Sequence, residues 1–273
     1  MNKLAEKVQQ DLLKAIEHDD LVLPTLPEVA LKIRQAAENP EISVGTLSKV
    51  IGGDTALSAR LIKVVNSPLL RAAQEVNELH TAITRLGINY SSNLAIGLVM
   101  EQIFHARSEV VERKMREVWR KSQEIAGICY ALCRHHHYLK ADQAALGGLV
   151  HQIGVLPILT YAEDHYELLS DPLCLDHVIE SIHPLIGEKL LAVWEFPEQL
   201  AKLPGQYLDF SRQSEKVDYV DLVQIATLHC YQGTDHPLGQ IPLSSLSAVR
   251  RLGIDPLNER WLIEMEEARG MFI

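Results

Sequence analysis

The chain has 273 residues, enough for one large or two medium domains that each bury an apolar core. Its formal net charge of −10 argues against a nucleic-acid-binding protein, because contact with phosphates needs a basic surface. The N-terminal stretch is charged and amphipathic rather than a signal peptide, and we expect no run as long as the ~18 apolar residues of a membrane span, so we expect a cytoplasmic protein without membrane contact.

The composition favours helices packed on helices. Aromatic residues make up only 5% of the chain, so Leu, Ile, Val and Ala side chains are expected to build the core. No segment has the alternating β-branched residues that are typical of a half-buried strand. The four cysteines form no CxxC pair, which indicates buried, reduced thiols. The predicted class is all-α.

Helical patterns begin at the N-terminus. Residues 1–20 predict an amphipathic helix. Thr25 and Glu28 then have the spacing of a capping box, in which two side chains satisfy backbone N–H groups at a helix start. Asp54 is placed to cap the next strongly periodic helix, predicted over residues 55–66. Two more helices, separated by Gly87 and predicted in "ELHTAITRLG" and "SSNLAIGLVMEQIF", complete an N-terminal bundle.

The chain is predicted to divide into an N-terminal helical subdomain over residues 1–112 and a second helical subdomain over residues 113–273. Long helices are expected in the second part over residues 118–134 and 142–151, and after Pro184. "VDYVDLVQIATLHCYQ" predicts another helix, and the tail predicts two short helices around an "LGID" turn.

Several short motifs follow one another in a recognisable order. They are "LPTLPEV", "NP", "LSKVIGGDTALSARLIKVVNS", "AITRLG" and "NLA" in the first half, and "VWRKSQEIA", "GGLVHQIGVLPIL" and "IHPLIGEKLLAVWEFPEQL" in the second. This series resembles the HDOD domain, the HD-related output domain. The resemblance implies an N-terminal helical bundle packed on a degenerate HD-phosphohydrolase-like bundle. It also implies a bacterial regulatory module that takes part in signal transduction.

Catalytic HD enzymes hold divalent metal with a histidine, a consecutive His-Asp pair and a later aspartate, which leaves positions open for water and phosphate. The resemblance places Lys121 at the first histidine, His151 and Gln152 at the His-Asp pair, and Thr227 at the later aspartate. An ammonium group repels a metal ion, and an amide oxygen is a weaker ligand than a carboxylate. Of the four ligands only His151 remains, so we expect a dismantled metal site with no catalytic residue and no cofactor.

Many relatives with this domain keep a His–His pair after a "W-x-x-P" segment. Here Gln206 and Tyr207 stand at those positions. His183 matches a histidine common to HD proteins, and we expect it to form a hydrogen bond with His151 across the packed remnant of the site. If a divalent metal does bind, it is expected near these two histidines.

Two further groups could bind metal. His135, His136 and His137 are consecutive, so on a continuing helix they point ~100° apart and cannot share one ion. A polar helix end is the simpler interpretation. His177 and Glu180 lie one helical turn apart, a spacing that can bind metal but is also ordinary on an exposed helix.

The replaced ligands favour a non-catalytic regulatory module that binds a signalling protein or a small nucleotide, through the cleft between the halves or exposed apolar positions. The alternative is a divergent metal-dependent phosphohydrolase acting on a nucleotide or cyclic dinucleotide, with Asp176, Glu180 or Asp221 in place of the lost acids. The overall charge disfavours nucleic-acid binding through the basic residues Arg60, Lys63, Arg71 and Arg85.

Overall fold

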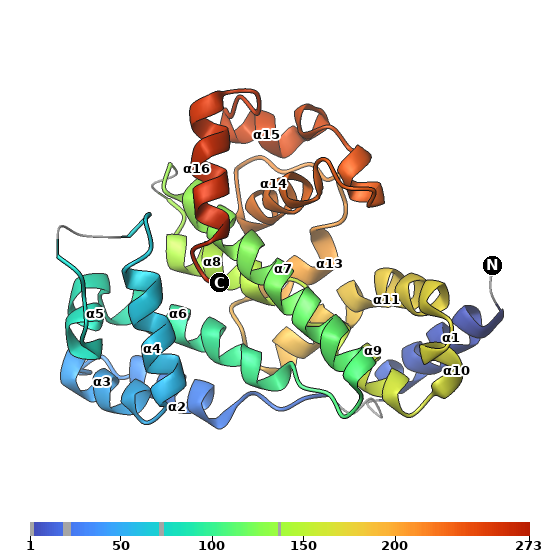
Figure 1. The fold of residues 1–273 in the computed structure, drawn as a ribbon, viewed down its shortest axis with the longest axis horizontal. Coiled ribbons are helices and arrows are strands. Elements are labelled where there is room, and N and C mark those ends of the chain that lie inside the picture. The colour runs from blue at the N-terminus through green and yellow to red at the C-terminus, as the bar shows by residue number, and fades with distance from the viewer. Residues whose placement is uncertain (1–2, 19–22, 71–73, 136–137) are drawn as a thin grey trace.

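The computed structural model describes residues 3–18, 23–70, 74–135 and 138–273, and every regular element within these ranges is a helix (Figure 1). The all-α prediction is therefore confirmed. One apolar cluster, formed mainly by Leu, Ile, Val and Ala side chains, runs through both halves of the chain. This continuity follows from helices with wide apolar faces, which must pack against more than one neighbour to leave water.

The N-terminal bundle packs short helices around α6. Its members are α2 (Glu28–Ala37), α3 (Val44–Gly52), α4 (Thr55–Val65), α5 (Leu79–Leu86), α6 (Ile88–Val99) and the 3-10 turn η1 (Met100–Ile103). Helix α1 (Lys3–Glu17) does not lie with them. It packs against α11 (Pro172–Val193), on the side of the molecule away from α3 and α5 (Figure 1).

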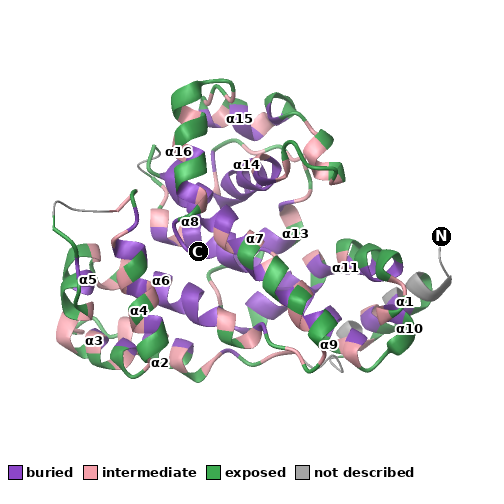
Figure 2. Cartoon of the chain, viewed as in Figure 1, coloured by how far each residue is buried: buried purple, intermediate pink, exposed green. Residues whose placement is uncertain are grey.

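The second half is arranged around α7 (Glu109–Cys133), which contacts α8, α9, α14 and α16. Figure 2 shows that α8, α14 and the C-terminal half of α7 are mostly buried. Besides α7 and α11, this half contains α8 (Ala141–Val150), α9 (Val155–Glu163), α10 (Tyr166–Leu169), α12 (Glu198–Ala201), α13 (Leu203–Gln206), α14 (Tyr219–Tyr231), α15 (Ser247–Leu252), α16 (Glu259–Arg269), and the 3-10 turns η2 (Pro237–Gln240) and η3 (Leu243–Ser245).

Local capping agrees with the sequence at one predicted position and differs at the other. The Asp54 carboxylate accepts a hydrogen bond from the Leu57 backbone N–H (3.0 Å), so the predicted cap of α4 is confirmed. The capping box at Thr25 and Glu28 is wrong, because Pro27 precedes the first residue of α2 and no side chain caps that helix. Proline suits this place, since its lack of an N–H removes one donor that would otherwise stay unsatisfied.

Two long helices extend beyond their predicted limits. Helix α11 runs through Pro184 instead of starting after it. Proline in a helix interior removes one hydrogen bond, but the buried face of α11, with Ile182 and Ile186 on either side, keeps the helix intact through packing. Helix α7 begins at Glu109, so the proposed division at residues 112/113 falls inside it. The charged segment before Val118 is the N-terminal part of that helix, which buries Val111 and Met115 and exposes most of its charged side chains.

Glycines allow the central helices to approach closely. A Cβ atom on Gly148 of α8 would lie 2.5 Å from the Cα atom of Ala126 in α7. A Cβ atom on Gly154, which precedes α9, would lie 2.0 Å from the carbonyl oxygen of His183 in α11. Real Cβ atoms do not approach other atoms this closely, so only glycine permits these two contacts.

The stretch Ala141–Glu163 is long and apolar enough to cross a membrane by length and composition alone, so the expectation that no such run exists is wrong for these residues. Most of this stretch is buried inside the protein. It contains α8 and α9, which contact α7 and α11. The high apolar content of this stretch therefore reflects a position in the middle of the fold.

Candidate functional site

His151 lies directly after α8 and is fully buried. Its Nδ1–H donates to the carbonyl oxygen of Gly148 at 2.7 Å, which places the lone pair of the neutral imidazole on Nε2. Nε2 is buried and has no hydrogen-bond partner among the described residues. The histidine that the motif retains therefore offers one free nitrogen inside the protein.

His183 projects from the middle of α11 and is buried as well. Its Nδ1–H donates to the carbonyl oxygen of Ile179 (2.7 Å), so its Nε2 is an acceptor. The Tyr207 hydroxyl donates to that Nε2 at 2.7 Å. Both nitrogens of His183 are therefore already used within the protein.

Tyr207, directly after α13, lies beside both histidines. Its ring is 1% exposed and meets the His151 and His183 rings edge-on, with centroid separations of 4.9 and 5.9 Å. The Gln152 amide reaches the Tyr207 hydroxyl at 3.4 Å. The predicted direct hydrogen bond between the two histidines is wrong, because the hydroxyl of Tyr207 takes the nitrogen of His183 that the bond would need.

Lys121 and Thr227, at the other two ligand positions, offer no carboxylate or imidazole. The Lys121 ammonium binds the carboxylate of Glu124 (3.1 Å) and lies 5.3 Å from the centroid of the Tyr231 ring. Thr227 is fully buried, and its hydroxyl has no hydrogen-bond partner in the part of the chain that the structure describes. A hydroxyl is a weak ligand for a divalent ion, and an ammonium opposes one.

His151, His183 and Tyr207 form a buried histidine cluster, and burial keeps these three side chains uncharged. Burial lowers the pKa of His151 to about 3 and that of His183 to about 4. It also raises the pKa of Tyr207 well above its usual value, so the phenol keeps its proton and can donate. Neutral imidazoles are able to bind metal, but no carboxylate completes the set, and within the described ranges no three His, Cys, Asp or Glu side chains gather as a metal site would need. The donor groups of this cluster do not fit the HD metal centre.

A family model described as "HDOD domain" matches residues 23–205, which is more than half of the chain. The chain belongs to the HDOD domain family. The resemblance of the sequence motifs is thereby confirmed, and with it the coarse class of the protein, a regulatory output domain.

Three proteins are similar to this HDOD chain in sequence or in structure. A protein from Shewanella amazonensis SB2B named "Putative metal-dependent phosphohydrolase" is 29% identical over 100% of both chains, with a TM-score of 0.89. A "Putative signal transduction protein" from Marinobacter aquaeolei VT8 is 21% identical over 100% of this chain and 66% of its own, with a TM-score of 0.65, and shows the shared fold. An uncharacterized protein from Treponema pallidum (strain Nichols) is 24% identical over 84% of this chain, and this chain spans about half (46%) of that relative.

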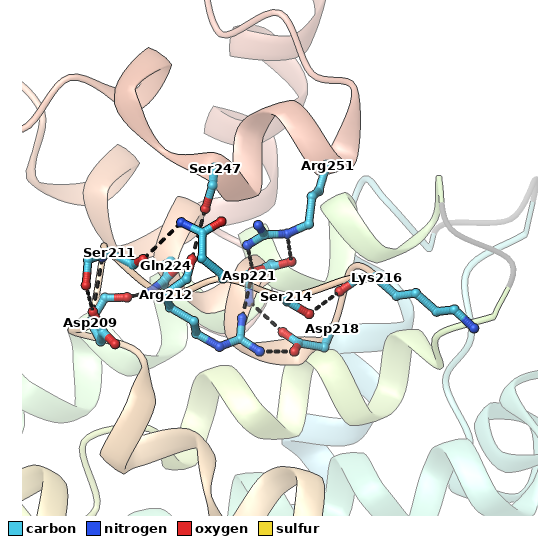
Figure 3. A network of polar contacts seen from close by, with 11 residues as sticks. Asp209, Ser211, Arg212, Ser214, Lys216, Asp218, Asp221, Gln224, Ser247 and Arg251 are labelled. Atoms are coloured by element: carbon cyan, nitrogen blue, oxygen red, sulfur yellow. Dashed lines mark hydrogen bonds and ion pairs between the residues drawn. The ribbon is translucent and has the colours of Figure 1, made fainter.

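In the described part of the chain, none of the acids considered as replacement ligands forms a metal-binding group with the two histidines. Asp176 is exposed and pairs with Lys114, while Glu180 is exposed on the surface of α11. Asp221 is fully buried, but Figure 3 shows its carboxylate held between the guanidinium groups of Arg212 and Arg251. The distances are 2.8 Å from Arg212 and 2.7 and 2.9 Å from Arg251. This carboxylate is committed to joining α14 to α15 and to the loop before α14.

Of the remaining candidate residues for metal or nucleic-acid binding, some form pairs within the protein and others lie outside the described residues. His135 lies just after α7 and pairs with Glu264 of α16 (3.5 Å), whereas His136 and His137 lie outside the described residues. Arg60 pairs with Glu101 within the N-terminal bundle. Arg71 lies outside the described residues.

The neutral histidines predict that this HDOD fold loses stability in mild acid. Each histidine has a lower pKa in the folded than in the unfolded chain, so the unfolded chain binds more protons below about pH 6.5. Their contribution is complete above that pH and falls as the pH drops towards about 4, by up to roughly 1.4 kcal/mol per pH unit for each histidine. Urea unfolding at pH 7, 5.5 and 4.5 measures this loss. A His151→Gln variant is expected to show a clearly shallower pH dependence; an equally steep one would contradict the assignment.

A second candidate site was predicted only as a location between the two halves. A cleft of about 310 Å³ lies where α2 and α6 face α8 and the segment after α11. Residues of the histidine cluster do not line it. Sequence reasoning did not find its lining residues, since Asp142 at the start of an apolar helix is indistinguishable from an ordinary acidic first turn.

Proposed function

We propose that this HDOD chain is a non-catalytic regulatory module that acts by binding a signalling protein or a small nucleotide. The observation that carries the proposal is the hydrogen bond from Tyr207 to Nε2 of His183. It occupies one of the two buried histidines near which a bound metal ion would lie. At the HD ligand positions themselves, the ammonium of Lys121 and the amide of Gln152 replace a histidine and an aspartate, so the fold is retained while the metal-binding groups are not.

Metal content tests this proposal. The purified protein is loaded with Mn²⁺, Fe²⁺ or Zn²⁺, freed of unbound ion, and analysed by elemental mass spectrometry. We expect well below one metal ion per chain, because the buried cluster offers no carboxylate. The His151→Ala variant is expected to bind as little as the wild type, as is His177→Ala, which removes an exposed histidine of α11.

A divergent metal-dependent phosphohydrolase is the second candidate function. It is supported by the free Nε2 of buried His151 and by the similarity to the Shewanella amazonensis protein of that name. One or two metal ions per chain, lost in His151→Ala but kept in His177→Ala, together with turnover of a nucleotide or cyclic dinucleotide, would establish this alternative and overturn the first proposal.

A further inference from the structure

The cleft between the two halves has the size of a small-molecule site. Its volume of about 310 Å³ lies at the lower end of the range typical for organic ligands. Both halves contribute to it, through α2 and α6 on one side and α8 on the other. Its apolar surface is formed by Leu26, Ala30, Ile96, Leu146, Phe196 and Leu200.

One rim of the cleft is tied to both halves. The Trp194 indole N–H donates to the carbonyl oxygen of Pro24 (3.0 Å), and Arg34 of α2 donates to the carbonyl oxygen of Trp194. The next residue, Glu195, has a positive φ of 55°, which is unfavourable for any residue with a side chain. The fold thus holds Phe196 against the cleft in a fixed backbone conformation.

A mostly buried carboxylate lines the cleft. Asp142 is 7% exposed, and its Oδ2 accepts a hydrogen bond from the Asn93 amide at 2.5 Å. Within the described residues Asp142 forms no ion pair and its Oδ1 accepts no hydrogen bond, and this oxygen is not buried away from the cleft. A ligand that presents N–H donors could therefore pair with Oδ1, whereas a ligand that presents an acceptor would be repelled by it.

Two cations at the mouth of the cleft, Arg34 and Lys140, are available to face a phosphate. Arg34 has no carboxylate partner within the described residues, and Lys140 is exposed at the rim. Glu38 and Glu195 also line the cleft and are exposed, so they offset much of this positive charge. With Asp142 the cleft is lined by two cations and three acids, so repulsion is smaller for a single phosphate than for the several charges of a triphosphate.

We propose that this cleft binds a guanine nucleoside monophosphate, an inference that rests on the proposed function and names the ligand of the binding module. The apolar surface would accept the flat base. Asp142 would accept hydrogen bonds from the N1–H and N2–H₂ groups of guanine, and Arg34 and Lys140 would face the phosphate. Adenine presents an acceptor at N1, which Asp142 would repel, so the site discriminates between the two purines.

Isothermal titration of the full chain with GMP, AMP, XMP and L-arginine tests this inference. We expect saturable binding of one GMP per chain. AMP is expected to bind at least about tenfold more weakly than GMP. Asp142→Asn is expected to weaken GMP binding about tenfold and to improve XMP binding, because the C2 carbonyl of xanthine accepts a hydrogen bond from the new amide. Asp176→Asn, on the exposed surface of α11, is the matched control and should leave all four titrations unchanged.

Several outcomes would overturn the inference. They are the absence of saturable GMP binding, equal affinity for GMP and AMP, or GMP binding that is unchanged in a folded Asp142→Asn variant. Saturable L-arginine binding without GMP binding would identify the cleft as a site for a cationic ligand instead. The comparison of GMP with AMP needs no variant, so it remains decisive if Asp142→Asn does not fold. Failure here leaves the proposed regulatory function standing, since metal content and turnover test that function separately.

Discussion

The Asp221→Asn variant is expected to lose about 3–5 kcal/mol of the free energy of unfolding. The wild-type carboxylate is fully buried and binds Arg212 and Arg251, which are themselves mostly buried (Figure 3). An asparagine side chain keeps the shape but removes the negative charge and one acceptor, so Arg251 loses its carboxylate partner and Arg212 keeps only Asp218. Removal of one member of a buried ion group is costly for this reason, even where the intact group contributes little net stability.

Urea unfolding followed by circular dichroism at pH 7 measures the effect of Asp221→Asn. Asp176→Asn provides the control, because Asp176 is half exposed in its pair with Lys114 and its loss is expected to cost no more than about 1 kcal/mol. If the two variants lost similar free energy, the buried network would not join α15 to α14 as described. Arg251→Met would then be the next variant to examine.

The Gly154→Ala variant is expected to lose about 3 kcal/mol or more, or to fail to fold. A Cβ atom at this position would lie 2.0 Å from the carbonyl oxygen of His183 and 2.4 Å from the backbone nitrogen of Gly187. Both neighbours are backbone atoms of α11, so no side-chain rotation can relieve the overlap. The helices α9 and α11 would have to separate, which would open the contact that buries His183.

Gly45→Ala is the matched control for this substitution. Gly45 lies in α3, where the nearest atom to a new Cβ would be the Ser43 side-chain oxygen at 3.8 Å. Alanine favours a helix over glycine, so a gain of about 0.5 kcal/mol is expected from the same chemical change. Thermal unfolding of the two variants should therefore shift in opposite directions. A decrease of only a few tenths of a kcal/mol for Gly154→Ala would show that α9 and α11 are not held as closely as the structure indicates.

Local structure followed from the sequence wherever one neighbouring interaction decides it. Asp54 caps α4 because its carboxylate needs only the N–H group three residues later. The prediction failed where distant packing decides the outcome. Pro184 would end an isolated helix, yet α11 continues through it because Ile182, Ile186 and their neighbours are buried on both sides of the proline. Similarly, α1 lies against α11, which no pattern in residues 1–20 could indicate.

The same distinction separates the two candidate sites. The loss of the HD ligand set could be read from Lys121, Gln152 and Thr227, because the identity of a side chain by itself decides whether it can bind a metal ion. The role of Tyr207 could not be read, because its hydrogen bond to His183 joins groups 24 residues apart through the packing of α11 and α13. Asp142 and Arg34 lie 108 positions apart, and only the meeting of the two halves makes them line one cleft.

The sequence by itself determined the helical class of this protein, the family to which it belongs, and the loss of the chemical groups that hold metal in HD enzymes. These properties depend on side-chain identity and on contacts within a few residues, which the order of amino acids states directly. Only the tertiary structure decided that Tyr207 occupies the nitrogen of His183, that Asp221 is committed to two arginines, and that Asp142 lines the cleft between the two halves. Those properties depend on burial and on partners brought together from distant parts of the chain, because the cost of a charge or an unpaired polar atom is set by its surroundings in the folded protein.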